Sequence, residues 1–394
     1  MNRRDFLISA GVILAFSSVP FVRRVLPARP LTIADAYSLW YNRPAAVDVS
    51  GGFCFGYITS LGKIVVAEIT NDLLVRRTNV IYTYDGASDH GSPSLVTIPR
   101  GKHKGKILAC FSKHATPLMT MRTNMPGDIG SWEEASVLDH GRSTYASLAA
   151  LPEGRIVLMH TIQERIGSSD AGEWRRTVVR WTEDGGDSWS EPVQIVGFGA
   201  GTFPYSTPLA ASPDGRCAMA YAIYSSVTKR HHGLTVVVTS DSFMSQVDIP
   251  IDLGETSSKD TIPYETKWLA NGTLAVLFSQ MIDAKRSVSK VAFVCVESKS
   301  VLSVVTIFDT AVHSYAGGAS IDTHGVFAIG SPSTGGLVMQ DLSSGSKNTL
   351  VETGSFSSPW IFKSNGRSIL VALKNPSIKS TRNYSSDLYI TQLE

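Results

Sequence analysis

A unit of two short apolar runs separated by a glycine-bearing turn recurs along most of this chain. Each copy opens with a turn that contains Pro or an aromatic residue, and the six openings are His90, Tyr145, Tyr205, Tyr264, His313 and Phe356. Turns such as Pro-Glu-Gly, Pro-Asp-Gly and Ala-Asn-Gly supply the positive φ that a tight hairpin needs. Repeats of about 40–50 residues are typical of β-propellers. The pattern therefore predicts an all-β chain built from radial blades.

An earlier unit over residues 45–84, with its turn at Leu61-Gly62-Lys63, has the same strand–Gly–strand order. It brings the count to seven. We predict one domain over residues 31–394, a β-propeller of seven four-stranded blades, in which radial repetition leaves only short sheet edges. Six or eight blades are alternatives, and a β-sandwich followed by a second β-rich domain is the competing architecture.

Residues 1–30 read as a targeting segment that precedes the fold. Asn2-Arg3-Arg4-Asp5-Phe6-Leu7 is followed by an uncharged stretch to Val22, as in a signal with a charged n-region and an apolar h-region. The Arg-Arg-x-Phe-Leu order resembles a twin-arginine export signal, which the export machinery reads on an already folded protein. We expect a periplasmic or extracellular protein. Cleavage after Ala28 and an uncleaved membrane anchor are the two alternatives.

The charge of the remaining chain is close to balanced. Subtracting the five basic and one acidic residues of positions 1–30 from the totals of 36 and 34 leaves a net charge of −2. This balance argues against a nucleic-acid partner, which calls for a basic excess. The four cysteines lie in apolar runs without C-x-x-C spacing, so buried free thiols are expected, with disulfides as the alternative after export. We predict no metal and no cofactor, and we interpret His231-His232 as a solvated loop tip.

The segment Thr182-Glu183-Asp184-Gly185-Gly186-Asp187-Ser188-Trp189 fits the pattern S/T-x-D-x-G-x-T/S-W at every position. A carboxylate at Asp184 can accept backbone N–H bonds across a tight turn. Gly186 permits a backbone conformation that is closed to other residues, and Trp189 is large enough to fix the hairpin to its sheet. We predict a structural turn between the outer strands of a blade, with no catalytic role.

The segments Asp89-His90-Gly91-Ser92-Pro93, Phe111-Ser112-Lys113-His114 and Met121-Arg122-Thr123-Asn124 resemble the Asp-box (BNR-repeat) family that includes the propeller ulvan lyases. The likeness is densest over residues 85–220. In those lyases two histidines and a tyrosine from successive blades meet near the axis and carry out β-elimination on a uronate. The resemblance implies His90, His114 and Tyr145 as the catalytic acid/base set.

β-Elimination needs a base for the C5 proton, an acid for the leaving O4 and a group that neutralises the carboxylate. The resemblance implies an Arg as the neutraliser, late in the second strand of the third blade, but this chain has His160 at that position. Arg122 and Lys113 are possible electrostatic substitutes. Tyr205 opens the following blade in a Tyr-x-x-Pro turn. We therefore predict Arg122, His160 and Tyr205 as substrate-binding residues.

Three functions fit the sequence. The first is a polysaccharide lyase acting on an acidic, uronate-containing glycan. The second is a sialidase-like glycoside hydrolase, although the F/Y-R-I-P signature is absent and Tyr264-Glu265 is the only pair that suggests a nucleophile. The third is a non-catalytic propeller that binds glycan on its aromatic residues. In each case the partners are a polysaccharide or oligosaccharide and the export machinery, with membrane contact only through residues 1–30.

Overall fold

The computed structural model describes residues 29–165, 172–239, 243, 245–254, 260–283, 287–310, 318–380 and 382–393. Within these ranges the regular structure is β-strand, with one short 3-10 helix, η1 (Trp40–Asn42). Residues 1–28 of the predicted signal segment (residues 1–30) and the opening at His313 lie outside the described residues. In the described part of the chain, no helix is long and apolar enough to cross a membrane.

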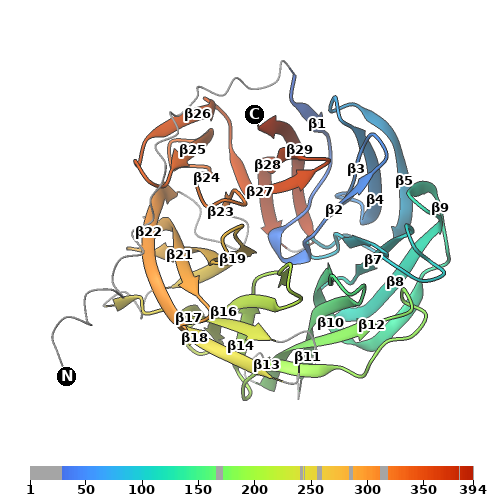
Figure 1. The fold of residues 1–394 in the computed structure, drawn as a ribbon, viewed down its shortest axis with the longest axis horizontal. Coiled ribbons are helices and arrows are strands. Elements are labelled where there is room, and N and C mark those ends of the chain that lie inside the picture. Colours follow the sequence, from blue (N-terminus) through green and yellow to red (C-terminus); the bar gives the residue numbers. More distant parts are fainter. Residues whose placement is uncertain are drawn as a thin grey trace, which may run out of the picture.

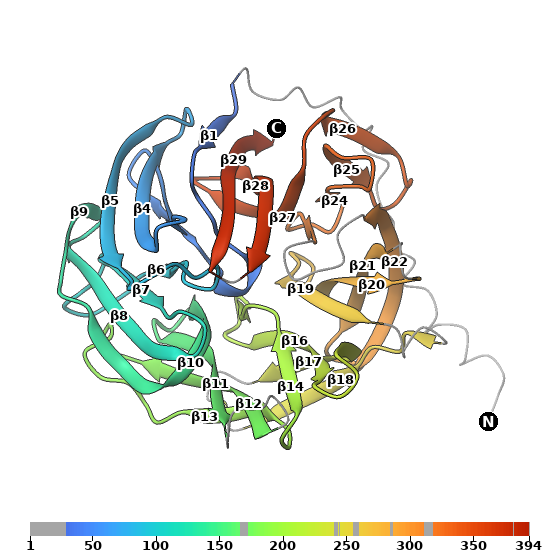
Figure 2. The same cartoon turned by 180° about the vertical axis from the view of Figure 1, so that it is seen from behind.

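The strands form sheets arranged side by side around a central axis, as in a β-propeller (Figures 1 and 2). Hydrogen bonding joins the described strands into six sheets, all with antiparallel neighbours. The first sheet contains β2 (Ala46–Val49), β3 (Gly52–Ile58), β4 (Lys63–Thr70) and β5 (Val75–Thr83). The second, eight-stranded sheet contains β6 (Ser94–Thr97), β7 (Ile107–Phe111), β8 (Thr116–Met125), β9 (Asp128–Trp132), β10 (Ser136–Ala150), β11 (Ile156–Arg165), β12 (Glu173–Thr182) and β13 (Val193–Gly197).

The next three sheets continue around the ring. One contains β14 (Thr202–Ser206), β15 (Ala210–Ala211), β16 (Cys217–Ser225), β17 (Arg230–Thr239) and β18 (Gln246–Pro250). Another contains β19 (Thr261–Trp268), β20 (Leu274–Met281), β21 (Ser287–Cys295) and β22 (Ser300–Thr310). The third contains β23 (Ala319–Ile321), β24 (Phe327–Gly330), β25 (Leu337–Asp341) and β26 (Lys347–Val351).

The last sheet closes the ring by combining the two ends of the described chain. It contains β27 (Phe356–Ser364), β28 (Arg367–Ser380), β29 (Asn383–Leu393) and the early strand β1 (Leu31–Ile33). Leu31 pairs with Ile390 and Ile33 pairs with Leu388. The strand β1 thereby covers an edge of β29 that would otherwise be open to solvent.

The turn at Leu61-Gly62-Lys63 differs from its predicted place in the repeat. It joins β3 to β4, whereas the innermost strand β2 turns into β3 at Ser50-Gly51. Gly51 supplies the positive φ of 78° for this inner turn. The apolar runs on both sides of Gly62 are fully buried strands, so the strand–Gly–strand pattern alone does not distinguish the inner hairpin from the next one.

A segment from Ala36 to Ala45 links β1 to β2 and lies against several inner strands; we call it the axial segment. Its backbone pairs with β3 through Tyr37 and Ile58, whose N–H groups each donate to the other's carbonyl at 2.9 Å. Trp40 packs edge-on against Tyr264 of β19, which lies far from it along the chain. Both rings are almost fully buried, so the axial segment is part of the core.

The turn over Thr182–Trp189 has the predicted geometry and the predicted place, between the outer strands β12 and β13. The Asp184 carboxylate accepts hydrogen bonds from the amides of Asp187 and Ser188, each at 3.0 Å, and from the Thr182 and Ser188 hydroxyls. Gly186 has φ 97°, and Trp189 packs on the hydrophobic cluster between β7 and β11.

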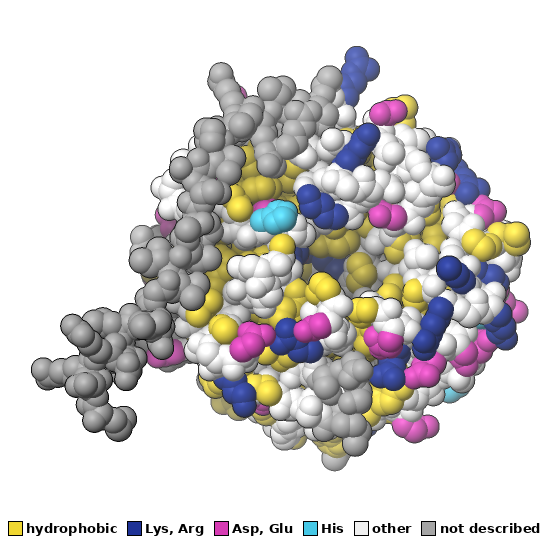
Figure 3. Space-filling view, in the orientation of Figure 1, with side chains coloured by type: hydrophobic (Ala, Val, Ile, Leu, Met, Phe, Trp, Pro, Cys, Tyr) yellow, Lys and Arg dark blue, Asp and Glu magenta, His cyan; other side chains and the backbone are white. Residues whose placement is uncertain are grey.

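The four cysteines are free thiols, as predicted. Cys54, Cys110 and Cys217 are buried, and Cys295 is partly exposed. On the face of the ring seen in Figure 3, acidic and basic side chains intermingle around a central hollow. That face therefore carries no broad region of a single charge.

The Asp184 hydrogen bonds predict a specific loss of stability. Burial alone would raise the pKa of Asp184, but the bonds from Ser188, Thr182 and the Asp187 amide outweigh it and lower the pKa to about 2. We expect Asp184→Ala to reduce the free energy of unfolding by about 1–3 kcal/mol at pH 7. The contribution is present above the unfolded pKa of about 3.9 and is lost as the pH falls towards 2, so urea unfolding at pH 7 and pH 3 measures it.

The matched control is Glu183→Ala in the same turn. Glu183 forms an exposed ion pair with Arg155 at 3.0 Å, which is worth no more than about 1 kcal/mol. Equal losses in the two variants would contradict the role assigned to the Asp184 carboxylate.

Candidate functional site

Side chains from the eight-stranded sheet and from the sheet that follows it in the chain meet in one cluster. His90 precedes β6, His114 follows β7, Tyr145 lies within β10 and Tyr205 lies in β14. Ring centroids are 4.9 Å apart for His90 and His114, 5.3 Å for His90 and Tyr145, and 6.1 Å for Tyr145 and Tyr205. We call these four residues the His–Tyr cluster. It unites the three predicted catalytic residues and one of the three predicted substrate-binding residues.

His90 is fixed by hydrogen bonds at both ring nitrogens. Nδ1 is hydrogen-bonded to the Asp89 carboxylate, and Nε2 lies 3.3 Å from the Tyr145 hydroxyl. A carboxylate only accepts hydrogen bonds, so Nδ1 of the neutral imidazole carries the proton and Nε2 accepts from Tyr145. His90 is 4% exposed and Asp89 is fully buried, which protects this pair from water.

The axial segment contacts both the ring and the backbone of His90. The Tyr41 ring stacks on His90 with a centroid distance of 5.0 Å. The Asn42 side-chain amide donates to the His90 carbonyl at 2.7 Å and to the Ser92 hydroxyl at 3.2 Å. Both residues are nearly fully buried, so the backbone that carries His90 is held in one position.

Tyr145 adopts a left-handed backbone conformation, with φ 61°. It sits at an irregularity in the pairing of β10 with β11, between Thr144 and Ser147. Such a conformation is costly for a residue with a side chain and is common at functional sites. Burial first, then the nearby Tyr205, raise the pKa of Tyr145 well above its usual value. The hydroxyl therefore keeps its proton at neutral pH.

Arg175 brings a positive charge to the cluster from β12. Its guanidinium carbon lies 4.6 Å from the centre of the Phe203 ring and 5.9 Å from that of Tyr205. Its Nε donates to Glu173 at 2.7 Å, and the side chain is 10% exposed. Arg142 lies 3.9 Å from the same glutamate. Two arginines thus share one carboxylate, which leaves one net positive charge beside the tyrosines.

His114 is the most exposed member of the cluster, but its ring packs edge-on against His90, with ring centroids 4.9 Å apart, so one side of it is shielded from water. Loss of hydration around its ring is the largest influence and lowers the pKa of His114. The neighbouring His90 ring and the charges of Arg175 and Arg142 lower the pKa further. The imidazole is therefore neutral at neutral pH and able to accept a proton.

A second carboxylate–histidine pair lies on the other side of Tyr205. The His231 ring centroid is 4.5 Å from that of Tyr205, and Asp260 accepts from the His231 amide at 2.7 Å and lies 3.1 Å from its Nδ1. The interpretation of His231 as a solvated tip is therefore wrong: the residue is the second of β17 and packs against the rings of Tyr205 and Tyr224. Its neighbour His232 follows it in the same strand.

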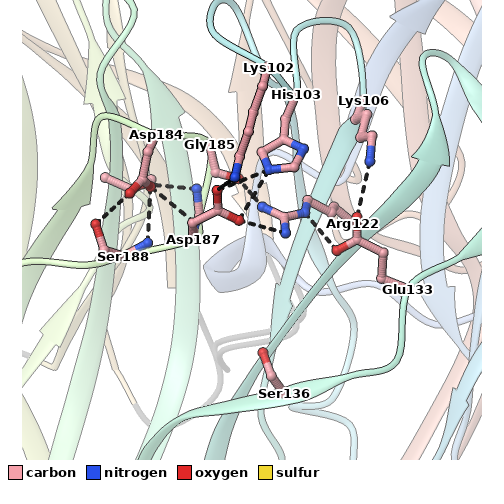
Figure 4. Close-up of polar contacts among 12 residues, drawn as sticks. Lys102, His103, Lys106, Arg122, Glu133, Ser136, Asp184, Gly185, Asp187 and Ser188 are labelled. Carbon is pink, nitrogen blue, oxygen red and sulfur yellow. Dashed lines mark hydrogen bonds and ion pairs between the residues drawn. The ribbon is translucent and has the colours of Figure 1, made fainter.

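Arg122, predicted to bind substrate, lies instead beside Glu133 and Asp187 (Figure 4). It is the seventh residue of β8 (Thr116–Met125), whereas His114 precedes that strand. The eight residue steps from His114 to Arg122 span roughly 26 Å of extended chain. Its guanidinium binds Glu133 at 2.7 Å, Asp187 at 2.8 Å and the Gly185 carbonyl at 3.0 Å. Arg122 therefore ties β8 to the Thr182–Trp189 turn.

His160, the other predicted substrate-binding residue, is fully buried in β11. Burial, followed by the charge of Arg180, lowers the pKa of His160 to about 3. Side chains alternate between the faces of a strand. Gln163 stands opposite Arg175 in the register, so His160 occupies the other face of the sheet from the arginine that reaches the cluster.

Sequence reasoning missed Arg175, Glu173 and the supporting Tyr41. The run Glu173-Trp174-Arg175-Arg176 was visible, but its distance from Tyr145 along the chain gave no reason to pair them. Among the residues that the structure describes, no group of three or more His, Cys, Asp or Glu is placed to hold a metal ion.

No protein-family model matches the chain, and no curated protein matches it. Solved structures match over most of its length. A polysaccharide lyase PL25 ulvan lyase, bound to -[GlcA(1-4)Rha3S]-, has a TM-score of 0.67 at 12% identity over 94% of this chain and 96% of that chain. The polysaccharide lyase Uly1 has a TM-score of 0.56 at 11% identity over 94% of this chain and 100% of that chain.

An oligogalacturonate lyase in complex with manganese has a TM-score of 0.52 at 10% identity, over 94% of this chain and 98% of that chain. At such identities the likeness shows the fold alone. The chain shares its all-β propeller fold with polysaccharide lyases, which agrees with the predicted fold class.

The shared carboxylate of Glu173 predicts a large effect on stability. Glu173→Gln leaves the buried Arg175 without a charged partner, and we expect the free energy of unfolding to fall by about 3 kcal/mol. In Glu164→Gln, which breaks a half-exposed pair with Arg176, we expect a loss of no more than about 1 kcal/mol. Urea unfolding compares the two, and a larger loss for Glu164→Gln would overturn the charge balance described for Arg175.

Proposed function

We propose that the protein is a polysaccharide lyase that cleaves a uronate-containing glycan by β-elimination at the His–Tyr cluster. The observation that carries the proposal is the meeting of His90, His114 and Tyr145 beside the buried cation Arg175. The solved ulvan lyase with the same fold is bound to an oligosaccharide that contains GlcA, which supports the substrate class.

The protonation states favour one division of roles. His114 is neutral and partly open to solvent, so it acts as the base and takes the C5 proton. Tyr145 is protonated and acts as the acid: its O–H proton goes to O4 as the C4–O4 bond breaks and the C4–C5 double bond forms. His90, whose Nε2 lies 3.3 Å from the Tyr145 oxygen, positions the hydroxyl before transfer. The nearby charge of Arg175 favours the tyrosinate that remains after it.

Arg175 neutralises the uronate carboxylate, the role for which the sequence suggested His160 or Arg122. Removing the C5 proton places negative charge on the uronate carboxylate, and a fixed cation in a poorly hydrated site stabilises that charge strongly. Tyr205 lies between Arg175 and His231 and is proposed to contact the sugar. His160 and Arg122 have no part in this scheme because their polar groups lie elsewhere in the fold.

The proposal extends to the organisation of the chain. We propose that β6–β9 and β10–β13 are separate blades within the eight-stranded sheet, which makes seven blades in all, and that residues 31–394 form this one domain. Residues 1–30 are proposed to direct export, which would bring the protein to glycans outside the cytoplasm.

The first test is an absorbance assay with the purified protein on ulvan and other uronate polysaccharides. An unsaturated uronate absorbs in the ultraviolet through its new double bond. We expect the wild-type protein to produce this signal, and His90→Ala, His114→Ala and Tyr145→Phe each to reduce kcat by about 100-fold or more. The control His324→Ala removes a histidine from the β23–β24 turn and should leave the rate unchanged.

Other results of this assay would indicate one of the two alternative functions. New reducing ends without the ultraviolet band would indicate the sialidase-like hydrolase alternative. Retention of a glycan with neither product would indicate a non-catalytic binding propeller. Full activity in both histidine variants would overturn the proposed site.

The pH profile tests the role of His114. The acid limb of kcat/KM should lie below the usual imidazole pKa of about 6.5, because the base stays neutral to lower pH. Arg142→Gln removes a positive group that lowers the pKa of His114, so it should move the acid limb to higher pH. Arg76→Gln, on the distant strand β5, should leave it in place, and a shift of the same size there would contradict the assignment.

A further inference from the structure

A row of rings continues from the His–Tyr cluster along one face of the next sheet. Tyr224 of β16 pairs with Phe203 of β14 on one side and with His231 of β17 on the other. Directly paired residues lie on the same face of a sheet, and Tyr205, two residues after Phe203, shares that face. The four rings are therefore neighbours. Tyr205 is the member of the row that contacts Tyr145, at 6.1 Å between ring centroids.

Tyr205 contacts side chains from two further strands. The guanidinium carbon of Arg175 lies 5.9 Å from the centre of its ring. The His231 ring stands almost perpendicular to it, with an interplanar angle of 86° and a centroid distance of 4.5 Å, which is an edge-to-face arrangement that aromatic rings favour. The place of Tyr205 beside the cation therefore depends on where the His231 ring lies.

One carboxylate oxygen of Asp260 holds His231. It accepts the His231 backbone amide at 2.7 Å and lies 3.1 Å from the ring Nδ1. A carboxylate only accepts hydrogen bonds, so Nδ1 of the neutral imidazole carries the proton. The two side chains are only 13% and 14% exposed. A single oxygen thus fixes both the backbone and the ring of the histidine.

Among the residues that the structure describes, the His231 ring has no second polar anchor, because its Nε2 is buried and makes no hydrogen bond to them. The ring of His90, by contrast, has partners at both nitrogens. Asp260 is itself fixed, since its carbonyl accepts the Met281 amide at 2.9 Å, and it directly precedes β19 of the following sheet. The orientation of the His231 ring is therefore set by Asp260.

We propose that Asp260 and His231 are positioning residues of the active site, which hold the Tyr205 ring beside Arg175 and Tyr145. The inference rests on the proposed function, because its kinetic consequence is a slower β-elimination. His231 acts through Tyr205 in this scheme, as Tyr41 of the axial segment acts through His90.

The kinetic test is a double-mutant cycle in the unsaturated-product assay on ulvan. We expect His231→Ala to lower kcat by about ten-fold, because misplacing a group by about 1 Å can slow a reaction by about 100-fold. Tyr205→Ala removes the side chain through which His231 acts, so adding His231→Ala to it should lower kcat no further. Losses that multiply in the double variant would overturn the positioning role.

The hydrogen bonds predict which substitution of Asp260 is better tolerated. Both bonds go to the same oxygen, and the carboxamide oxygen of asparagine can accept both. We expect Asp260→Ala to lower kcat about as much as His231→Ala, and Asp260→Asn to lower it much less. Equal losses in the two Asp260 variants would contradict the contact assigned to this oxygen.

The matched control is the neighbouring histidine. His232 is exposed and pairs with Ile223, whereas His231 pairs with Tyr224. Adjacent residues of a strand point to opposite faces, so His232→Ala removes an imidazole from the same strand without touching the row of rings. It should leave kcat at the wild-type value.

Tyrosine nitration reports on Tyr205 without any turnover. Tyr205 is half-buried, so loosening its ring should make it react faster with tetranitromethane, as measured by peptide mass spectrometry. We expect several-fold faster nitration of Tyr205 in His231→Ala and Asp260→Ala, and the wild-type rate in His232→Ala.

The two measurements separate this inference from the proposed function. Unchanged nitration of Tyr205 in His231→Ala would overturn the positioning role, even if the wild-type protein yields unsaturated product. Faster nitration in that variant of a protein that yields no such product would preserve the hold on Tyr205 and remove the proposed lyase function.

Discussion

Three consecutive residues of the axial segment join the inner strands of distant parts of the ring. Asn42 binds the His90 carbonyl, Arg43 donates to the carbonyls of Ser358 and Pro359 at 2.9 and 3.2 Å, and the Pro44 carbonyl accepts from Leu95 at 2.8 Å. Arg43 is 6% exposed, and burial lowers its pKa to about 10. A buried cation is tolerated only with such partners. The relative positions of the inner strands, and hence of the site, depend on this contact.

The same segment explains how a strained and poorly hydrated site persists. Tyr145 has a backbone conformation that costs on the order of 1–3 kcal/mol. Tyr41 packs against its ring at a centroid distance of 4.5 Å. Two residues further along β10, the Ser147 hydroxyl donates to the Arg43 carbonyl at 2.6 Å. The strain lies between contacts that fix the chain on both sides, so His90 and Tyr145 keep the spacing that proton transfer requires.

The sequence predicted the strands and turns of the fold better than it predicted which side chains meet in space. Alternating apolar runs and turn glycines are local signals, so the all-β repeat and the Asp184 turn could be recognised. The approach of His90, His114 and Tyr145 followed from a resemblance to a known family. Arg175 could not be found in this way, because its position depends on which residue of β11 it faces. A shift of one residue moves a side chain to the other face of a sheet, and His160 is on that other face.

A shared propeller fold at 12% identity leaves the chemistry to be decided by side chains. The His–Tyr cluster alone would suit several reactions, because histidine and tyrosine move protons in many enzymes. The buried cation Arg175 narrows the choice, because its side chain is 10% exposed and a buried cation is costly to keep. In the proposed elimination, negative charge develops on the uronate carboxylate, and a fixed cation stabilises that charge. A neutral sugar develops no such charge and would leave the cation without that role.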